Sequence, residues 1–577
     1  MTALNGELFG PDACFDLEDR STSLHNSDLL DAIRQLSTFE ERTGRRKTGV
    51  QRRVHYAGLD VEELGSIYES LLDYHPQVLR EPGRFALIAG SQRKETGSYY
   101  TPPEPVRELI ESALRPGDGS APRCREDKGG EAAGAAVIDN LHPAAGSGHF
   151  LLAAARHVGR ELAIIRSGEA EPAPETYRAA LRDVIRHCLY AVDKNPLAVD
   201  LCKVALWIEG HAPGLPLSFL DHRIRCGDGL IGVFQLDVLK AGVRDAAFKR
   251  LSGDDQAVCA ELRRINRRDR GGELAKFSAE ATLAELAGEF SALADMPDET
   301  PSDVRSKEEL YRQLKESERV ARLRNACDAW IGAFFAPRGL AQQRTAPTTA
   351  DVWKALSGLP NHQRAALIDE LSDRFHFFHW HLEFPEVFQR GGFDVVLGNP
   401  PWGVSQFVDD DFFPSVIADF NDLTAKRKKA AIREILTADA ILGSRFYTER
   451  RIIQSYNLFY RNSGNFTKSA YGKLNLYALF AERGYAVLNS RARAGLIVPT
   501  GLVTDEATSP LFQHFMVNGH LVSFIGFENE EFIFPGIANV NRFALATLCS
   551  ASETQTLPTF CFYLRKAKTG SPDGNTA

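Results

Sequence analysis

The sequence predicts an α/β protein built on a doubly wound, mostly parallel sheet. Between residues 137 and 232, short apolar stretches alternate with helical ones, the pattern of strands joined by crossover helices. A turn of small residues, Gly146-Ser147-Gly148, separates the first strand from the helix that follows. Strand-like sequence returns at residues 393–398 and 493–498. We therefore expect one sheet with strands from both halves of the chain.

The elements of this region follow in a regular order. AAVIDNL, CLYAVD and FLDHRIRCGD each supply a strand, while FLLAAARHVGRELA and PLAVDLCKVALWIE supply the helices between them. The strand FDVVLG and the strand in RAGLIVPTG come later in the chain. Because parallel strands end at one edge of a sheet, the residues after these strands should lie close together.

At 577 residues the chain is too long for one simple core, so we predict several domains. In the N-terminal part, helical spacing relates Leu29, Leu30, Ile33 and Leu36, and it recurs through VEELGSIYESLLDY. Residues 235–375 are charged and helix-rich. The predicted division is a helical N-terminal domain, the first half of the sheet, a helical insertion, the second half of the sheet and a polar tail: 1–92, 93–234, 235–375, 376–550 and 551–577.

Composition excludes several classes of protein. The chain has no run of about 20 apolar residues and no basic segment followed by an apolar one at its start, so we expect neither a membrane span nor a secretory signal. Nine scattered cysteines without CxxC pairs favour reduced thiols, a cytoplasmic location and no zinc site.

The net charge of −8 is not that of a small basic DNA-binding domain. Local groups of cations can still contact phosphates, although each such group is more often a solvated helix face than a phosphate contact. Three such groups occur: Arg45, Arg46, Lys47, Arg52 and Arg53; Arg263, Arg264, Arg267, Arg268 and Arg270; and Lys426, Arg427, Lys428 and Lys429.

The glycine turn has two acidic partners. Gly146 and Gly148 allow a sharp turn and close approach of the backbone to a ligand at a helix N-terminus. Asp193 ends the next strand, where a carboxylate can accept hydrogen bonds from a ribose diol. Asp228 follows the third strand at the same sheet edge. Together they predict a site for an adenosine-containing cofactor.

The most specific feature is Asn399-Pro400-Pro401-Trp402, delivered by the buried strand before it. The two prolines make the loop rigid. The Asn399 side-chain carbonyl and the Pro400 backbone carbonyl can accept both protons of an exocyclic amine, and Trp402 offers a surface on which an extruded base could stack. The alternative is a Pro-Pro turn beside a core tryptophan. Methyl transfer to such an amine requires neither a metal nor a general base.

The combination of these segments resembles the amino-methyltransferases with gamma-type motif order, in particular the methylase part of type IIG restriction-modification enzymes and the large methyltransferases of phage defence. The resemblance runs from about Leu64 to about Thr547. It implies a class I, Rossmann-like methyltransferase core that uses S-adenosylmethionine to methylate adenine in duplex DNA. The segments that carry it are GSYYTPPEPVREL, HPAAGSGHFLL, AVDKNPLAVDLCKVALW, FLDHRIRCGDGLIG, FHWHLEFPEVF and FDVVLGNPPWG.

The resemblance also implies roles for individual residues. The segment that closes over the methionine part of the cofactor corresponds to Tyr100, Thr101 and Pro102. The cofactor loop corresponds to Ala144, Gly146, Ser147 and Gly148. The acid that binds ribose corresponds to Asp193, the acid near the adenine amino group to Asp228, and the catalytic loop to Asn399, Pro400, Pro401 and Trp402.

Two features depart from the family pattern. His142 and Ala145 stand where the family has Asp and Cys in DPACGSG, and a neutral imidazole cannot supply the same charge near the sulfonium. Asp139-Asn140, three residues earlier, is the one candidate for compensation. The second departure is the absence of a long target-recognition region at the end, which leaves recognition to a separate subunit, to the helical insertion or to a part missing by truncation.

Other functions remain open at this stage. A catalytically silent DNA-binding or scaffold subunit of a defence complex would fit His142 and the short C-terminal part. Methylation of cytosine N4, of adenine in RNA or of glutamine in protein uses related loops, although Asn399 rather than Ser favours adenine. Residues 1–90 lack a strand that carries an acid followed by an Asp/Glu-x-Lys triplet, so we expect no nuclease activity.

Overall fold

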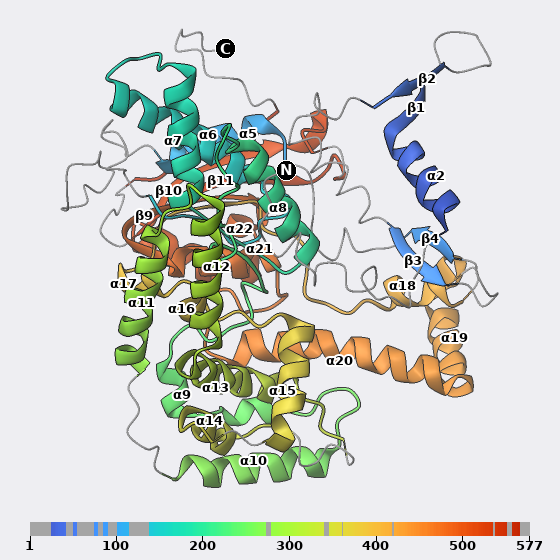
Figure 1. The fold of residues 1–577 in the computed structure, drawn as a ribbon. Coiled ribbons are helices and arrows are strands. Elements are labelled where there is room, and N and C mark those ends of the chain that lie inside the picture. Colours follow the sequence, from blue (N-terminus) through green and yellow to red (C-terminus); the bar gives the residue numbers. More distant parts are fainter. Residues whose placement is uncertain are drawn as a thin grey trace.

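A computed structural model gives the fold, and all structural statements concern the residues that it describes (Figure 1). These are residues 25–41, 50–54, 74–78, 85–89, 101–114, 138–272, 279–339, 346–359, 362–417, 420–534, 537–550 and 557–565.

An eight-stranded sheet forms the centre, with strand order β12-β10-β11-β9-β8-β5-β6-β7. The five strands from β9 to β7 are parallel, β11 is antiparallel to both β9 and β10, and β12 is parallel to β10. The order reverses between β5 and β8, which is the switch point of a doubly wound sheet. The predicted fold class is confirmed. The strands are β5 (Asn140–His142), β6 (Leu189–Asp193), β7 (Ile224–Cys226), β8 (Phe393–Gly398), β9 (Leu488–Pro499), β10 (Leu521–Glu528), β11 (Arg542–Cys549) and β12 (Thr559–Leu564).

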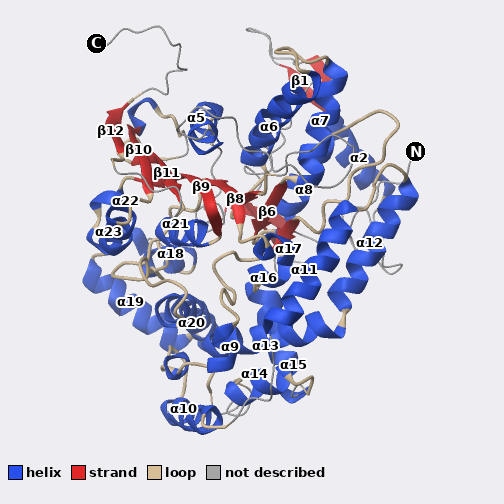
Figure 2. Cartoon of the chain, turned by 90° about the vertical axis from the view of Figure 1, so that its left-hand side faces the viewer, coloured by secondary structure: helices blue, strands red, loops and turns tan. Residues whose placement is uncertain are grey.

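Helices cover both faces of the sheet (Figure 2). Along β6, Leu189 and Ala191 join the core with the first helices, whereas Tyr190 and Val192 join the core on the other face. This alternation follows from the two-residue period of a strand. One face carries α5 (Pro103–Leu114), α6 (His149–Ser167), α7 (Pro174–His187) and α8 (Pro196–Glu209), and the other carries α16 (Trp380–Glu383), α17 (Pro385–Gln389), α21 (Leu476–Ala486), α22 (Gly501–Thr504) and α23 (Ser509–Val517).

The segment between β7 and β8 is helical, as predicted. The second half of its central helix, α13, is buried continuously from Ala326 to Phe335, where the sequence WIGAFF is apolar on every side. These side chains share one core with β6 and β8, so the helices extend the core of the sheet. The segment contains α9 (Asp237–Ala241), α10 (Gln256–Arg270), α11 (Ala279–Asp295), α12 (Pro301–Glu316), α13 (Glu318–Phe335), α14 (Thr349–Leu356) and α15 (His362–Phe375).

A second helical segment, which the sequence patterns did not predict, lies between β8 and β9. It comprises α18 (Asp409–Phe412), α19 (Ala425–Ala438) and α20 (Ala440–Asn462). A separate small core of phenylalanines holds it together: Phe412, Phe413, Phe420 and Phe446. In Figure 1, α18 and α19 extend to one side of the body while α20 leads back toward α13.

An ionic cluster anchors α20 to the first helical segment. Asp254, 4% exposed, accepts from Arg338 (2.9 Å) and Arg451 of α20 (3.1 Å). Arg451 also donates to the carbonyl oxygens of Phe335 and Ala336, at the C-terminal end of α13. A cation there complements the negative end of the helix dipole.

The prediction of a helical N-terminal domain is correct for one helix and wrong for the other described parts. Leu29, Leu30, Ile33 and Leu36 lie on α2 (Asn26–Ser37), as their spacing predicts. The other described residues form two antiparallel pairs of strands, and most of VEELGSIYESLLDY lies outside the described residues. Pro82-Gly83, a turn-forming pair between two apolar stretches, was the overlooked signal. The pairs are β1 (Thr38–Glu41) with β2 (Val50–Arg53) and β3 (Tyr74–Val78) with β4 (Phe85–Ala89).

The predicted polar tail, residues 551–577, is also wrong in part. TFCFYL forms β12 at the edge of the sheet. Its aromatic and apolar residues favour a strand despite the polar residues around them. Among the described helices, none combines the length and apolar character needed to cross a membrane.

Candidate functional site

The turn after β5 depends on its glycines. Gly146 and Gly148 have φ of +53° and +86°, a region that favours glycine. A Cβ on Gly148 would lie 2.6 Å from the Cys202 sulfur of α8, so this glycine permits close packing. A Cβ on Gly146 would meet no described atom within 4 Å. Gly148 therefore permits close packing against α8, whereas Gly146 faces open space.

Asp193, the last residue of β6, holds the turn in place. Its Oδ2 accepts from the Gly146 N–H and its Oδ1 from the Asn195 N–H, both at 2.8 Å. Desolvation raises the pKa of Asp193, while these two N–H groups oppose that shift. A carboxylate oxygen has a second acceptor position, so Asp193 can also bind a hydroxyl.

Asp228 follows β7 at the same edge and is 8% exposed. Its Oδ1 accepts from the Leu230 N–H at 3.0 Å, and burial raises the pKa of its carboxyl. A Cβ on Gly229 would lie 3.2 Å from the Pro143 carbonyl oxygen. Glycine there lets the segment after β7 lie against the segment after β5.

Asn399, at the end of β8, is oriented by two neighbours. The Trp402 indole N–H donates to Asn399 Oδ1 at 2.9 Å, and Asn399 Nδ2 donates to Thr101 Oγ1 at 3.1 Å. Because an indole can only donate, the amide oxygen must face Trp402. This oxygen keeps a second acceptor position. Pro400 is buried, as expected for a rigid loop.

The Trp402 ring is partly buried and packs against aromatic residues of the sheet and its following loop. It lies 6.1 Å from Phe543, nearly parallel to it, and 5.5 Å from Phe534, edge to face. The interpretation as a core tryptophan therefore accounts for part of its contacts.

A cavity of about 560 Å³ opens at the switch point of the sheet. Of the predicted residues it brings together Ala144, Asp193, Asp228 and Pro401. Its other walls include Lys194, the loop from Gly403 to Val408, which contributes Phe407, and aromatic side chains of later helices. The sequence reasoning missed these aromatic residues, since no local pattern marks them: Phe407, Phe412, Tyr456, Tyr460 and Phe480.

The remaining predicted residues surround this cavity without lining it. They are Thr101, Pro102, Gly146, Ser147, Gly148, Asn399, Pro400 and Trp402. Tyr100 lies outside the described residues.

His142 is buried beside β8. It is 3% exposed, its ring is 5.1 Å from that of Phe150, and a Cβ on Gly398 would lie 3.3 Å from it. Burial and the nearby His149 lower the pKa of His142 to about 3, so the imidazole is neutral. Asp139 does not replace the missing acid, because it pairs with Arg390 (2.6 Å) toward the opposite end of β5.

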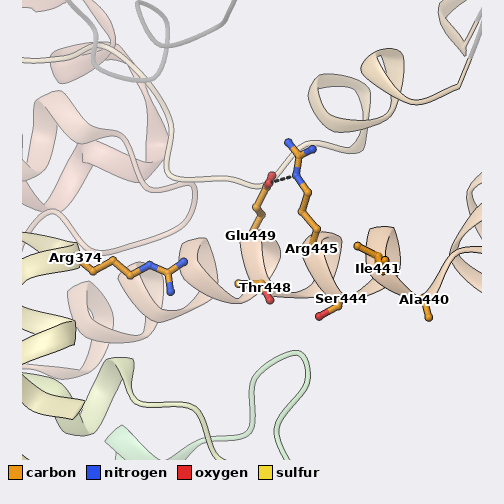
Figure 3. A pocket seen from close by; sticks show the side chains of 7 residues that line it. All are labelled: Arg374, Ala440, Ile441, Ser444, Arg445, Thr448 and Glu449. Atoms are coloured by element: carbon orange, nitrogen blue, oxygen red, sulfur yellow. Dashed lines mark hydrogen bonds and ion pairs between the residues drawn. The ribbon is translucent and has the colours of Figure 1, made fainter. Parts of the chain in front are cut away.

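A second hollow, of about 600 Å³, lies along α20 (Figure 3). Arg374, Ser444, Arg445 and Thr448 contribute to its walls. Glu449 lines both this hollow and the cavity at the sheet edge. Within the described part of the chain, no three His, Cys, Asp or Glu side chains are grouped to hold a metal ion.

The family model for the Eco57I restriction-modification methylases matches residues 187–434 and 439–534, more than half of the chain. The chain belongs to this family. The match covers Asp193, Asp228 and the Asn399 loop, and also the α19–α20 segment.

Among curated proteins, a Methanocaldococcus jannaschii protein with the provisional name of type II restriction enzyme and methyltransferase is 22% identical over 281 residues. The alignment covers 46% of this chain and 22% of that relative, so the chain spans about a fifth of its length.

Solved structures were also compared. A DrdV–DNA complex has a TM-score of 0.34 at 11% identity and covers 88% of this chain and 30% of its own. The type ISP enzyme LlaBIII bound to DNA gives 0.33 at 9%, with 80% and 20% covered. A Listeria monocytogenes class I S-adenosylmethionine-dependent methyltransferase, itself provisionally named, gives 0.18 at 11%, with 72% and 93% covered. The family assignment rests on the family model.

Proposed function

We propose that this chain methylates the exocyclic amino group of adenine in duplex DNA with S-adenosylmethionine, within a restriction-modification or phage-defence system. The observation that carries the proposal is the position of Asn399. It ends β8 with a fixed amide orientation, next to the segment after β5 that contributes to a cavity with Asp193 and Asp228. Membership of a restriction-modification methylase family supports the same reaction.

The residues around the cavity fit the cofactor. The volume of about 560 Å³ is in the range of ligand sites. Asp193 would accept from the ribose hydroxyls, and Asp228 from the adenine amino group. The open space beside Gly146 would let the backbone approach the cofactor closely. Thr101 and Pro102 would lie over its methionine part.

S-adenosylmethionine, when bound, supplies a methyl group on a sulfonium sulfur. Asn399 Oδ1 and the Pro400 carbonyl oxygen would accept hydrogen bonds from the two N–H groups of the amine. These hydrogen bonds would orient the nitrogen lone pair toward the methyl carbon. The amine nitrogen would bond to the methyl carbon while the carbon–sulfur bond breaks and leaves a neutral thioether, and the methylated amine would then release a proton to water. Neither a metal nor a general base is needed.

Trp402 would stack on the extruded base. Since Phe543 lies nearly parallel to the indole, the base would occupy the side of the ring away from Phe543. A separate recognition or defence subunit belongs to the same proposal. So do the domain boundaries after residues 92, 234, 375 and 550, with the strands described above in the first and last parts.

The test is transfer of labelled methyl groups to mixed-sequence duplex DNA, followed by identification of the methylated nucleoside by mass spectrometry. Asn399→Ala should lower kcat by about 10²–10³, as expected for loss of one transition-state contact. Asn518→Ala, at an exposed asparagine outside the site, should leave kcat unchanged. Detection of N4-methylcytosine would show that the target base is cytosine and not adenine. Equal rates for the two variants would refute the role of Asn399.

A catalytically silent subunit is the competing proposal, and His142 favours it. An observation against the silent subunit is that the His142 imidazole lies against Gly398 and Phe150 and does not line the cavity. Its neutral state therefore leaves the wall of the cavity unchanged. Binding of S-adenosylmethionine by calorimetry separates the two proposals, because a silent subunit should bind it poorly and transfer no methyl group. RNA and protein glutamine serve as further test substrates.

A further inference from the structure

The hollow on α20 continues into the cavity at the sheet edge. Ser444, Arg445 and Thr448 line the hollow, Ile452 and Tyr456 line the cavity, and Glu449 between them lines both. From Arg445 to Tyr456 is 11 residues, or about 16 Å of helix, the axial rise of about five stacked nucleotides. A strand that delivered a base to the cavity would therefore reach the hollow with its flanking nucleotides.

The hollow offers the groups that bind phosphates. Figure 3 shows Arg374 reaching from the end of α15 along α20, toward Thr448. Arg374 forms no ion pair within the described part of the chain, and its guanidinium carbon lies 5.5 Å from the centre of the Phe375 ring. Arg445 donates from its Nε to Glu449 at 2.8 Å, and its guanidinium carbon lies 5.4 Å from the centre of the Phe412 ring. Arginine and hydroxyl side chains are common donors to the DNA backbone. The ion pair with Glu449 holds Arg445 in place and leaves its terminal nitrogens for a ligand.

The neighbouring helix adds positive charge. Residues 425–450 contain seven Lys and Arg against three Asp and Glu, in a chain of net charge −8. On α19, Lys428 pairs with Asp410 of α18, whereas four cations are exposed: Lys426, Arg427, Lys429 and Arg433.

A second basic group, on α10, is different in character. Arg264 pairs with Glu261, while Arg267 and Arg270 both pair with Asp245. No residue of α10 lines the hollow or the cavity. Its charges are largely neutralised within the protein, which fits a solvated helix face.

We propose that the face of α20 from Ile441 to Glu449, with Arg374, binds the phosphate backbone of the DNA strand beside the target base. This inference rests on the proposed function and adds the path of the substrate. Arg374 and Arg445 contact phosphates, Ser444 and Thr448 donate hydroxyl hydrogen bonds, and Glu449 keeps phosphates on the hollow side of the cavity entrance.

The test measures binding of a fluorescent mixed-sequence duplex by anisotropy over a range of salt concentrations. The slope of log K against log salt is negative, and each lost phosphate contact reduces its magnitude by about 0.9. Arg374→Ala/Arg445→Ala should therefore reduce the magnitude by about 1.8. Arg374→Lys/Arg445→Lys should keep the slope of the parent chain. Arg264→Ala/Arg268→Ala removes the same charge on α10 and should also keep it. All variants should bind S-adenosylmethionine as the parent chain does.

The outcomes are distinguishable. If the parent chain binds DNA and Arg374→Ala/Arg445→Ala has the same slope, the path along α20 is wrong while the proposed function stands. An equal fall in slope for Arg264→Ala/Arg268→Ala would mean that net charge rather than this surface acts on DNA, and it overturns the inference. A parent chain without salt-dependent DNA binding overturns the inference, whereas the methyl-transfer assay decides the proposed function.

Discussion

The glycine turn after β5 allows stability and cofactor binding to be separated by two substitutions. Gly148→Ala meets two obstacles: a positive φ, which costs about 1–2 kcal/mol for a residue with a Cβ, and the Cys202 sulfur at 2.6 Å. Overpacking of the core costs a further amount of about 1–3 kcal/mol. We expect the free energy of unfolding to fall by about 2–5 kcal/mol.

Gly146→Ala should behave differently. It shares the positive φ but meets no described atom within 4 Å, so it should cost only about 1–2 kcal/mol of stability. Its methyl group would project into the space proposed for the cofactor. The dissociation constant for S-adenosylmethionine should therefore rise at least about tenfold, equivalent to about 1.4 kcal/mol.

The assay is urea unfolding of the parent chain, Gly148→Ala, Cys202→Ala and the double variant. Cys202→Ala removes the sulfur that a Cβ on Gly148 would strike, so the double variant should recover about 1–3 kcal/mol relative to the sum of the single effects. Additive effects would show that the turn moves rather than clashes. Calorimetry of Gly146→Ala completes the comparison, and an unchanged affinity would refute the placement of the cofactor beside this glycine.

Three further predictions concern buried ionisable groups. Asp254→Ala leaves Arg338 and Arg451 without their carboxylate, so the free energy of unfolding, from chemical denaturation, should fall by about 3–5 kcal/mol; a loss below about 1 kcal/mol would contradict the anchoring role. The folded state holds His142 neutral with a pKa of about 3, whereas the unfolded chain takes up a proton at His142 below about pH 6.5. His142 therefore does not lower the free energy of unfolding above pH 6.5, and it lowers that free energy progressively as the pH drops toward 3. Between pH 7.5 and 5, His142→Gln should lose about 2 kcal/mol less than the parent chain, and equal losses would place the acid sensitivity elsewhere. Asp193→Asn keeps an acceptor for one N–H but removes the charge, so calorimetry should find weaker binding of S-adenosylmethionine with a smaller effect on folding; intact binding would exclude the ribose-binding role.

The parts that sequence reasoning predicted are those encoded locally. The apolar runs of β6 and β8 identify buried strands, and the ends of parallel strands share one edge of the sheet. Asp193 and Asn399 therefore come to the switch point by their positions alone. The glycines at 146 and 148 signal a tight turn, and both have positive φ.

The parts that it missed depend on tertiary contacts. Tyr456 and Tyr460 line the cavity because α20 turns back against the body of the protein, which no local pattern records. The four phenylalanines that hold α18–α20 together are scattered over 35 residues, from Phe412 to Phe446. β12 is an edge strand in polar surroundings, and its aromatic residues Phe560 and Phe562 remain largely exposed.

The cluster of Asp254, Arg338 and Arg451 has a consequence for protein engineering. It ties α20 to the helices between β7 and β8, so two segments that lie before and after β8 in the sequence depend on each other. If α18–α20 alone were transferred to a related methylase, Arg451 would be separated from the Asp254 carboxylate and from the carbonyl oxygens at the end of α13 to which it donates in this chain. A functional exchange would have to move residues 245–338 and 409–462 together.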